Sequence, residues 1–200
     1  STCSYENTFF SGGGLDPRSM AFNTNGTKLF IYDQTGNYSV KQYSLNSAYN
    51  LTNATLEKQY TGTASKTLKE IEQFAQGMAF SADGTKMYLT GDKEDNVVEF
   101  TLSTPFDLSD VTKEGAYSVA GEITKMSGIA FSADGLKMFI TDFHNGDTSK
   151  DVTEFDLTCG FGVIKCIDPT ANKDDVASIE TQSEGTKKLI QHTTYPVLNR

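Results

Sequence analysis

The sequence is poor in the residues that several common functions require. Its 200 residues hold 17 lysines and arginines against 26 aspartates and glutamates, a formal net charge of −9. Such a chain lacks the positive field that attracts phosphate backbones, which disfavours nucleic-acid binding. No apolar run approaches the ~18 to 20 residues that span a bilayer. The apolar and aromatic content is nevertheless sufficient for a folded domain with a core of its own.

Motifs of catalysis and metal binding are also scarce. The two histidines, His144 and His192, have no partner at the spacing of a zinc site. No Gly-x-Ser-x-Gly nucleophile motif occurs, and the glycines at 12–14 are not followed by the lysine and hydroxyl residue of a phosphate-binding loop. We therefore expect a protein that is not an enzyme.

An internal repeat is the strongest signal in the sequence. Residues 19–31 recur as residues 77–89 and again as residues 128–140. The unit is about fifty residues long, with loops of variable length, and three units occupy most of the chain. A period of this size is typical of repeat architectures built from one supersecondary unit.

Each unit is predicted to form four short strands. Asp83-Gly84 lies between two apolar runs and favours a tight hairpin, and Asn25-Gly26 and Asp134-Gly135 occupy the same place in the other units. A third strand with period-two spacing follows, and then a fourth. The expected fold class is all-β, with three repeats of a four-stranded antiparallel sheet. The unit boundaries are expected at about 12–63, 64–121 and 122–166.

The third unit lacks a fourth strand of its own. Residues 4–10 precede the first unit and are predicted to supply that strand, so that the N-terminus completes the last sheet. Cys3 and Cys166 then occupy neighbouring positions, and a bond between them would add about 3 to 5 kcal/mol of stability. A local Cys159–Cys166 bond and three free thiols are the alternatives. Residues 1–166 would form the repeat domain.

Residues 167–200 differ in composition from the repeats. Acidic residues at the start and Pro196 near the end predict a short helix between them. Its thin apolar stripe favours docking on its own domain over a coiled-coil stalk. We interpret the ending at Arg200 as a truncation and Ser1 as a mature or engineered start.

A family resemblance rests on the repeat itself. Residues 80–89 and 100–109 resemble the blade repeat of bacterial surface propeller proteins, over about residues 4–165. Residues 174–200 are similar to the linker before the outer-membrane barrel in autotransporter-like proteins of marine alphaproteobacteria. The resemblance implies a displayed passenger, at the extracellular or outer-membrane surface, held to the membrane only through a C-terminal anchor that this sequence does not contain.

The number of units sets a geometric problem. Three units are fewer than an ordinary closed propeller contains. We therefore expect either a triangular arrangement or a ring that several chains share, which would make the protein a homo-oligomer.

The loops between the second and third strands are the candidate binding sites, because equivalent loops share one rim. Aromatic and amide side chains there could stack on a sugar and hydrogen-bond to it. The candidates are Tyr32, Asn37, Tyr38, Phe143, His144 and Asn145. The alternative is that the tyrosines belong to strand faces.

The same loops are rich in the oxygen ligands that calcium prefers. The candidate ligands are Asp92, Asp95, Asp142 and Asp147. Solvated turns are the alternative, because none of the loops matches the twelve-residue calcium-binding pattern. No other cofactor is expected.

These observations favour a non-enzymatic binding or adhesion module that recognises a glycan or a surface protein. A structural or assembly subunit of a filament or virion surface is the first alternative. A propeller-type hydrolase is the second, and it fits less well because the first strands offer Met20, Met78 and Ile129 where such enzymes place metal ligands.

Overall fold

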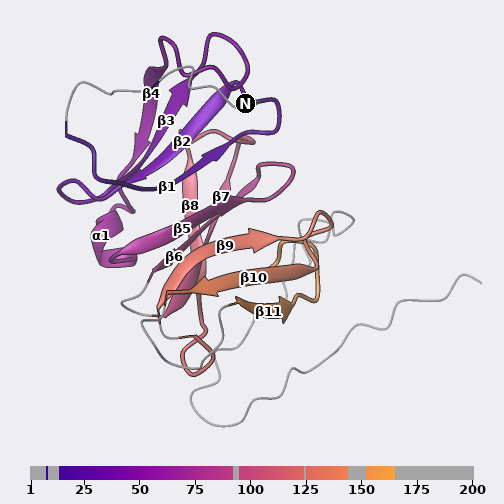
Figure 1. Ribbon diagram of the computed structural model, residues 1–200. Helices are drawn as coiled ribbons and strands as arrows, with labels where there is room; N and C mark the ends of the chain where they lie inside the picture. Colours follow the sequence, from indigo (N-terminus) through magenta and orange to yellow (C-terminus); the bar gives the residue numbers. More distant parts are fainter. Residues whose placement is uncertain (1–7, 9–13, 92–94, 124, 144–151, 165–200) are drawn as a thin grey trace, which may run out of the picture. The chain divides into compact units, whose positions relative to one another are not determined.

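The structure is a computed structural model that describes Thr8 and residues 14–91, 95–123, 125–143 and 152–164 (Figure 1). A first compact unit covers Ser1–Ile167. Every element below belongs to the first unit. The expected strand at residues 4–10 and the expected helix after residue 167 lie outside the described residues.

The described chain is an array of three antiparallel sheets, and the predicted all-β repeat fold is confirmed. Each sheet is a meander in which consecutive strands pair, which we call a blade. The first blade contains β1 (Pro17–Phe22), β2 (Lys28–Asp33), β3 (Ser39–Ser44) and β4 (Thr55–Tyr60). The second contains β5 (Ala75–Phe80), β6 (Lys86–Gly91), β7 (Asn96–Leu102) and β8 (Val111–Ser118). The third contains β9 (Met126–Phe131), β10 (Lys137–Asp142) and β11 (Val152–Asp156).

Side chains close the hairpin between the first two strands of each blade. In the second blade, the amide of Thr85 donates to Asp83 Oδ1 (3.0 Å) and the amide of Lys86 donates to Ser81 Oγ (2.9 Å). Gly84 takes a φ of 73°, which suits glycine because it has no Cβ. The amides of Leu136 and Lys137 make the same bonds in the third blade. The repeated sequence therefore encodes one turn three times.

An aromatic residue covers the glycine of each hairpin. The amide of Phe106 donates to the carbonyl oxygen of Gly84 (2.9 Å), and its ring occupies the place that a Cβ on Gly84 would need. Tyr49 and Phe161 make the same contact with Gly26 and Gly135. This contact explains why an aromatic residue recurs at one position after the third strand of every unit.

A short helix, α1 (Leu68–Ile71), connects the first two blades, and the repeat pattern does not predict it. Leu68 is buried in the core between these blades. The amide of Thr67 donates to Glu70 Oε2 (2.8 Å), as in a capping box. The Thr-x-x-Glu pattern at residues 67–70 is the sequence signal that indicates the start of this helix.

The first strands of the three blades, β1, β5 and β9, follow one another through the array (Figure 1). The amide of Met78 in β5 donates to Ser19 Oγ in β1 (3.1 Å). A Cβ on Gly77 would lie 3.0 Å from the Cα of Gly128 in β9, so this close approach requires glycine. Two hydrophobic clusters fill the junctions, one between the first and second blades and one between the second and third.

Candidate functional site

The candidate site is the rim where the second strand of each blade ends. Tyr32, at the end of β2, is fully buried, and its hydroxyl donates to the carbonyl oxygen of Glu72 (3.3 Å). Burial is the main cause that raises the pKa of the Tyr32 hydroxyl above its usual value. The Tyr32 ring therefore packs in the core between blades, as the alternative of a tyrosine on a strand face predicts.

Tyr38 is buried as well, although it follows directly after an exposed loop. Its φ is 63°, and Lys69 Nζ of α1 lies 5.3 Å from the centre of its ring. The amide of Lys69 donates to the carbonyl oxygen of Asn37 (3.2 Å). The helix thus holds this loop in place and leaves the side chain of Asn37 exposed.

Two phenylalanine rings are exposed on the same rim. Phe143 follows β10, and 65% of its surface is accessible while its amide donates to the carbonyl oxygen of Lys125 (2.7 Å). Phe74 directly precedes β5, with an accessible fraction of 44% and a φ of 63°. Phe74 was missed because it lies in the connection between units, where the repeat has no counterpart. His144 and Asn145 lie outside the described residues.

Asp33 organises the loop of the first blade. Its buried carboxylate accepts hydrogen bonds from Lys41 Nζ (2.7 Å), the amide of Asp16 (2.8 Å), and both the amide and the hydroxyl of Thr35 (3.1 and 2.8 Å). Burial alone would raise the pKa of this carboxyl, but these donors outweigh it and lower the pKa below its usual value. This carboxylate is thus occupied by donors of its own blade.

Two of the four acidic residues proposed as calcium ligands lie among the described residues. Asp95 and Asp142 are partly buried at the ends of their loops, and the carbonyl oxygen of Asp95 accepts a hydrogen bond from the amide of Val119 (2.8 Å). Asp92 and Asp147 lie outside the described residues. Within the described ranges, no group of three or more His, Cys, Asp or Glu side chains could hold a metal ion. Calcium binding by these four residues stays a prediction.

The cysteines bear on how the array is closed. Cys159, in the turn after β11, takes part in a disulfide bond. Cys3 and Cys166 lie outside the described residues. A bond at Cys159 competes with the predicted Cys3–Cys166 bond, because each cysteine forms one disulfide. The pairing stays a prediction that peptide mass mapping without reduction can decide.

Comparisons with known proteins find solved structures that resemble this chain but no family to which it belongs. No family model and no curated protein matches this sequence. Among solved structures, a candidate 6-phosphogluconolactonase from Bacteroides fragilis matches with 18% identity and a TM-score of 0.45 over 63% of this chain and 32% of that one. Hydrazine synthase from Kuenenia stuttgartiensis matches with 17% identity and a TM-score of 0.47 over 77% of this chain and 36% of that one.

A third match is a chain of the nidogen/laminin complex, with 15% identity and a TM-score of 0.39 over 62% of this chain and 39% of that one. The present chain thus spans about a third of the length of the structures it matches. Likeness this distant does not transfer the activity of any of them. Among the described residues, no helix has the length and apolar character needed to cross a membrane.

Proposed function

We infer that this chain is a non-enzymatic binding module that recognises a glycan, at the extracellular or outer-membrane surface, through the rim of its blade array. The observation that carries the proposal is the exposure of Phe74 and Phe143 on this rim. Exposed aromatic side chains on loops held by a rigid scaffold are typical of binding surfaces.

The chemistry of the rim favours a sugar as the ligand. A phenyl ring offers an apolar face on which the C–H groups of a pyranose can stack, and the amide of Asn37 offers both a donor and an acceptor for hydroxyl groups. Backbone hydrogen bonds hold Phe143 and Asn37, and Phe74 directly precedes β5, so little backbone entropy is lost on binding.

The proposed location rests on the cysteine chemistry. Cys159 is disulfide-bonded, and disulfides persist mainly in oxidising compartments outside the cytoplasm. Display as the passenger of an autotransporter-like protein is the finer form of this proposal. It depends on the resemblance of residues 174–200, which lie outside the described residues.

A glycan array probed with the purified chain tests the proposal. We expect discrete binding that falls at least about tenfold when Phe74 and Phe143 are both replaced by alanine. Leu136→Ala is the control, because Leu136 is as exposed as Phe74 but lies at a hairpin between first and second strands. An array without binding, or equal losses in the control, would contradict the glycan proposal. Repeating the array with EDTA tests whether calcium takes part.

A further inference from the structure

The two junctions within the chain are built in the same way. Lys28 Nζ of the first blade donates to the carbonyl oxygen of Phe106 in the second (2.8 Å). Lys86 Nζ, at the same repeat position in the second blade, donates to the carbonyl oxygen of Phe161 in the third (3.1 Å). Each blade therefore offers a lysine on the face toward the next blade, which we call its leading face. The aromatic carbonyl lies on the opposite, trailing face.

A second bond repeats at the same junctions. Gln42 Oε1 of the first blade accepts from the amide of Leu108 in the second (2.9 Å). Glu99 Oε2 of the second blade accepts from the amide of Val163 in the third (2.9 Å). A side-chain oxygen on the third strand thus accepts from the backbone amide two residues after the aromatic residue of the next blade. The junction has a fixed set of partners that any further blade must match.

On the third blade, the leading set meets no further blade among the described residues. Lys137 and Glu154 stand at the positions of Lys86 and Glu99, and they pair with each other at the surface. Val152 stands at the position of two valines that are fully buried in the junctions, Val40 and Val97, yet 59% of its surface is exposed. The leading face of the third blade is thus a junction surface that no described residue covers.

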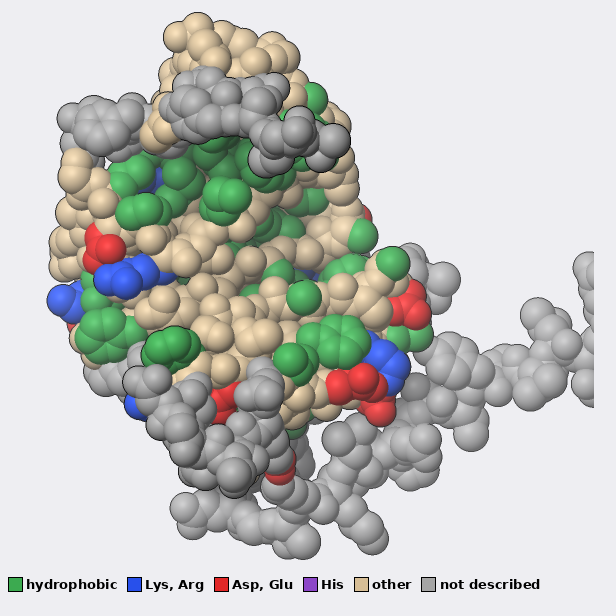
Figure 2. Space-filling view, viewed as in Figure 1, with side chains coloured by type: hydrophobic (Ala, Val, Ile, Leu, Met, Phe, Trp, Pro, Cys, Tyr) green, Lys and Arg blue, Asp and Glu red, His purple; other side chains and the backbone are tan. Residues whose placement is uncertain are grey.

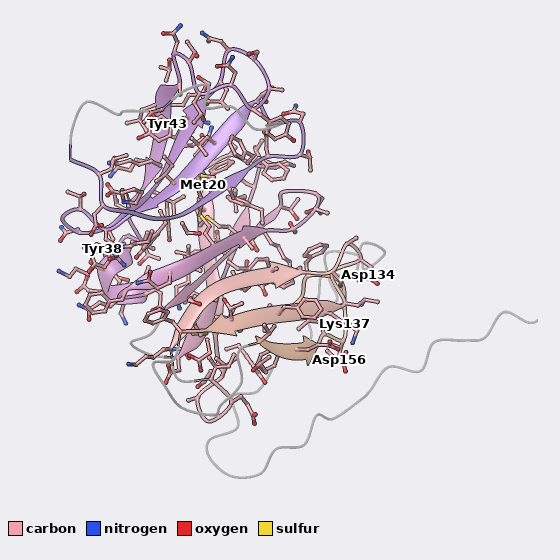
Figure 3. The ribbon with its side chains drawn as sticks, in the orientation of Figure 1. Met20, Tyr38, Tyr43, Asp134, Lys137 and Asp156 are labelled. Atoms are coloured by element: carbon pink, nitrogen blue, oxygen red, sulfur yellow. The ribbon has the colours of Figure 1, made fainter. Side chains whose placement is uncertain are left out.

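On the first blade, the trailing set likewise meets no other blade within the part of the chain that the structure describes. Tyr49 and Leu51 stand at the positions of Phe106 and Leu108, and Tyr49 is exposed. Met20 stands at the position of Met78, which is buried in the junction, but 65% of Met20 is exposed. Figure 2 shows hydrophobic side chains gathered over the first blade, and basic and acidic side chains together over β10 and β11. Figure 3 labels Met20 on the first blade and Lys137 with Asp156 on the third.

We propose that a second copy of this chain completes the ring. The leading face of the third blade in one copy docks on the trailing face of the first blade in the other, and the same contact forms a second time across a two-fold axis. Lys137 then donates to the carbonyl oxygen of Tyr49 in the second copy, and Glu154 accepts from the amide of Leu51. Six blades result, within the four to eight that closed propellers contain.

Continuity with the junctions inside the chain selects a second copy over an unrelated partner. Each end lacks a group that the other end of the same chain presents, so the contact is heterologous. A heterologous contact either closes into a ring or continues as an open fibre, according to the rotation per copy. The proposal does not depend on any ligand at the rim.

Light scattering coupled to size-exclusion chromatography of the full chain tests the proposal. We expect twice the mass of one chain for the wild type. Val152→Arg and Met20→Arg, one at each end, should each weaken the dimer at least about tenfold, because each places an uncompensated charge in both contacts. Both residues are exposed in the single chain, so both variants should keep the wild-type circular dichroism and melting temperature. Phe74→Arg, on the rim of the middle blade, should leave the dimer unchanged.

Mixing the two end variants distinguishes a head-to-tail contact from a symmetric one. A mixed pair has one contact with both substitutions and one with neither, so dimers should reappear on mixing. A wild type that stays monomeric at all concentrations would overturn the proposal. So would a dimer that tolerates either end variant, no recovery on mixing, or growth into species larger than two chains.

Discussion

The ammonium group of Lys86 in the second blade donates a hydrogen bond to the carbonyl oxygen of Phe161 in the third blade (3.1 Å). The same ammonium pairs with Glu99 (2.9 Å), whose side chain is completely buried. A lysine that a hydropathy pattern would place at the surface thus lies inside the molecule. The role of this repeat position is thus to contact the neighbouring blade, and loss of the contact should lower the stability of the fold.

Gly84→Ala should destabilise the fold more than Gly36→Ala, although both glycines have a positive φ. Alanine at position 84 meets both a left-handed backbone and the ring of Phe106, and we expect a loss of about 2 to 4 kcal/mol. Gly36→Ala is the matched control, because its φ is 65° and nothing lies within 4 Å of the added Cβ. Only the backbone cost of about 1 kcal/mol is expected there. Denaturant unfolding measures both, and equal losses would show that the ring makes room at no cost.

The Lys58–Asp107 pair should make stability depend on pH in the acidic range. Burial alone would raise the pKa of the Asp107 carboxyl, but hydrogen bonds from Lys58 and Ser109 outweigh it and lower the pKa to about 2. The pair links the first two blades. Because the folded-state pKa is below the unfolded value of about 4, its contribution is complete above pH ~4 and is lost as pH falls toward 2.

Asp107→Asn should therefore cost about 2 kcal/mol at neutral pH and much less near pH 2. Asp110→Asn, an exposed carboxylate three residues away, should change stability little at either pH. Urea unfolding at several pH values measures the difference. A loss from Asp107→Asn that stays the same at every pH would mean that its charge is not what stabilises the junction.

Asp33→Ala should loosen the rim of the first blade. It removes the acceptor for Lys41 Nζ and for the amides of Asp16 and Thr35. Both amides are partly buried and then lack that partner. A loss of about 2 to 3 kcal/mol is expected, together with faster hydrogen exchange at those amides. Asp16→Ala removes only an exposed pair with Arg18 and serves as the control. Unchanged exchange at both amides would rule out this role for Asp33.

The blades could be predicted from the sequence because their signals are local. The Asp-Gly and Asn-Gly corners and the period-two spacing at Val98, Phe100 and Leu102 correspond to hairpins and to β7 in the structure. Local patterns of this kind depend on residues a few positions apart, which a single repeat already contains.

The junctions and the burial of the rim tyrosines could not be predicted in this way. Lys28 meets Phe106 across 78 positions of the sequence, and no local pattern encodes such a pairing. Tyr32 and Tyr38 follow the same alternation as exposed rim residues would, and their burial depends on the packing of the next blade and of α1. The aromatic residues after the third strands recur in the sequence, but each contacts a hairpin glycine more than twenty positions earlier, which no local pattern encodes.

The lysine of each repeat is a junction residue wherever another blade follows it. Lys86→Met and Lys137→Met test this claim at the same repeat position, by denaturant unfolding at a concentration where light scattering finds single chains. Lys86→Met leaves Glu99 buried without its cation, so a loss of about 3 to 5 kcal/mol is expected. Lys137→Met removes only a surface pair and should leave the unfolding midpoint nearly unchanged. Similar losses in the two variants would contradict the account.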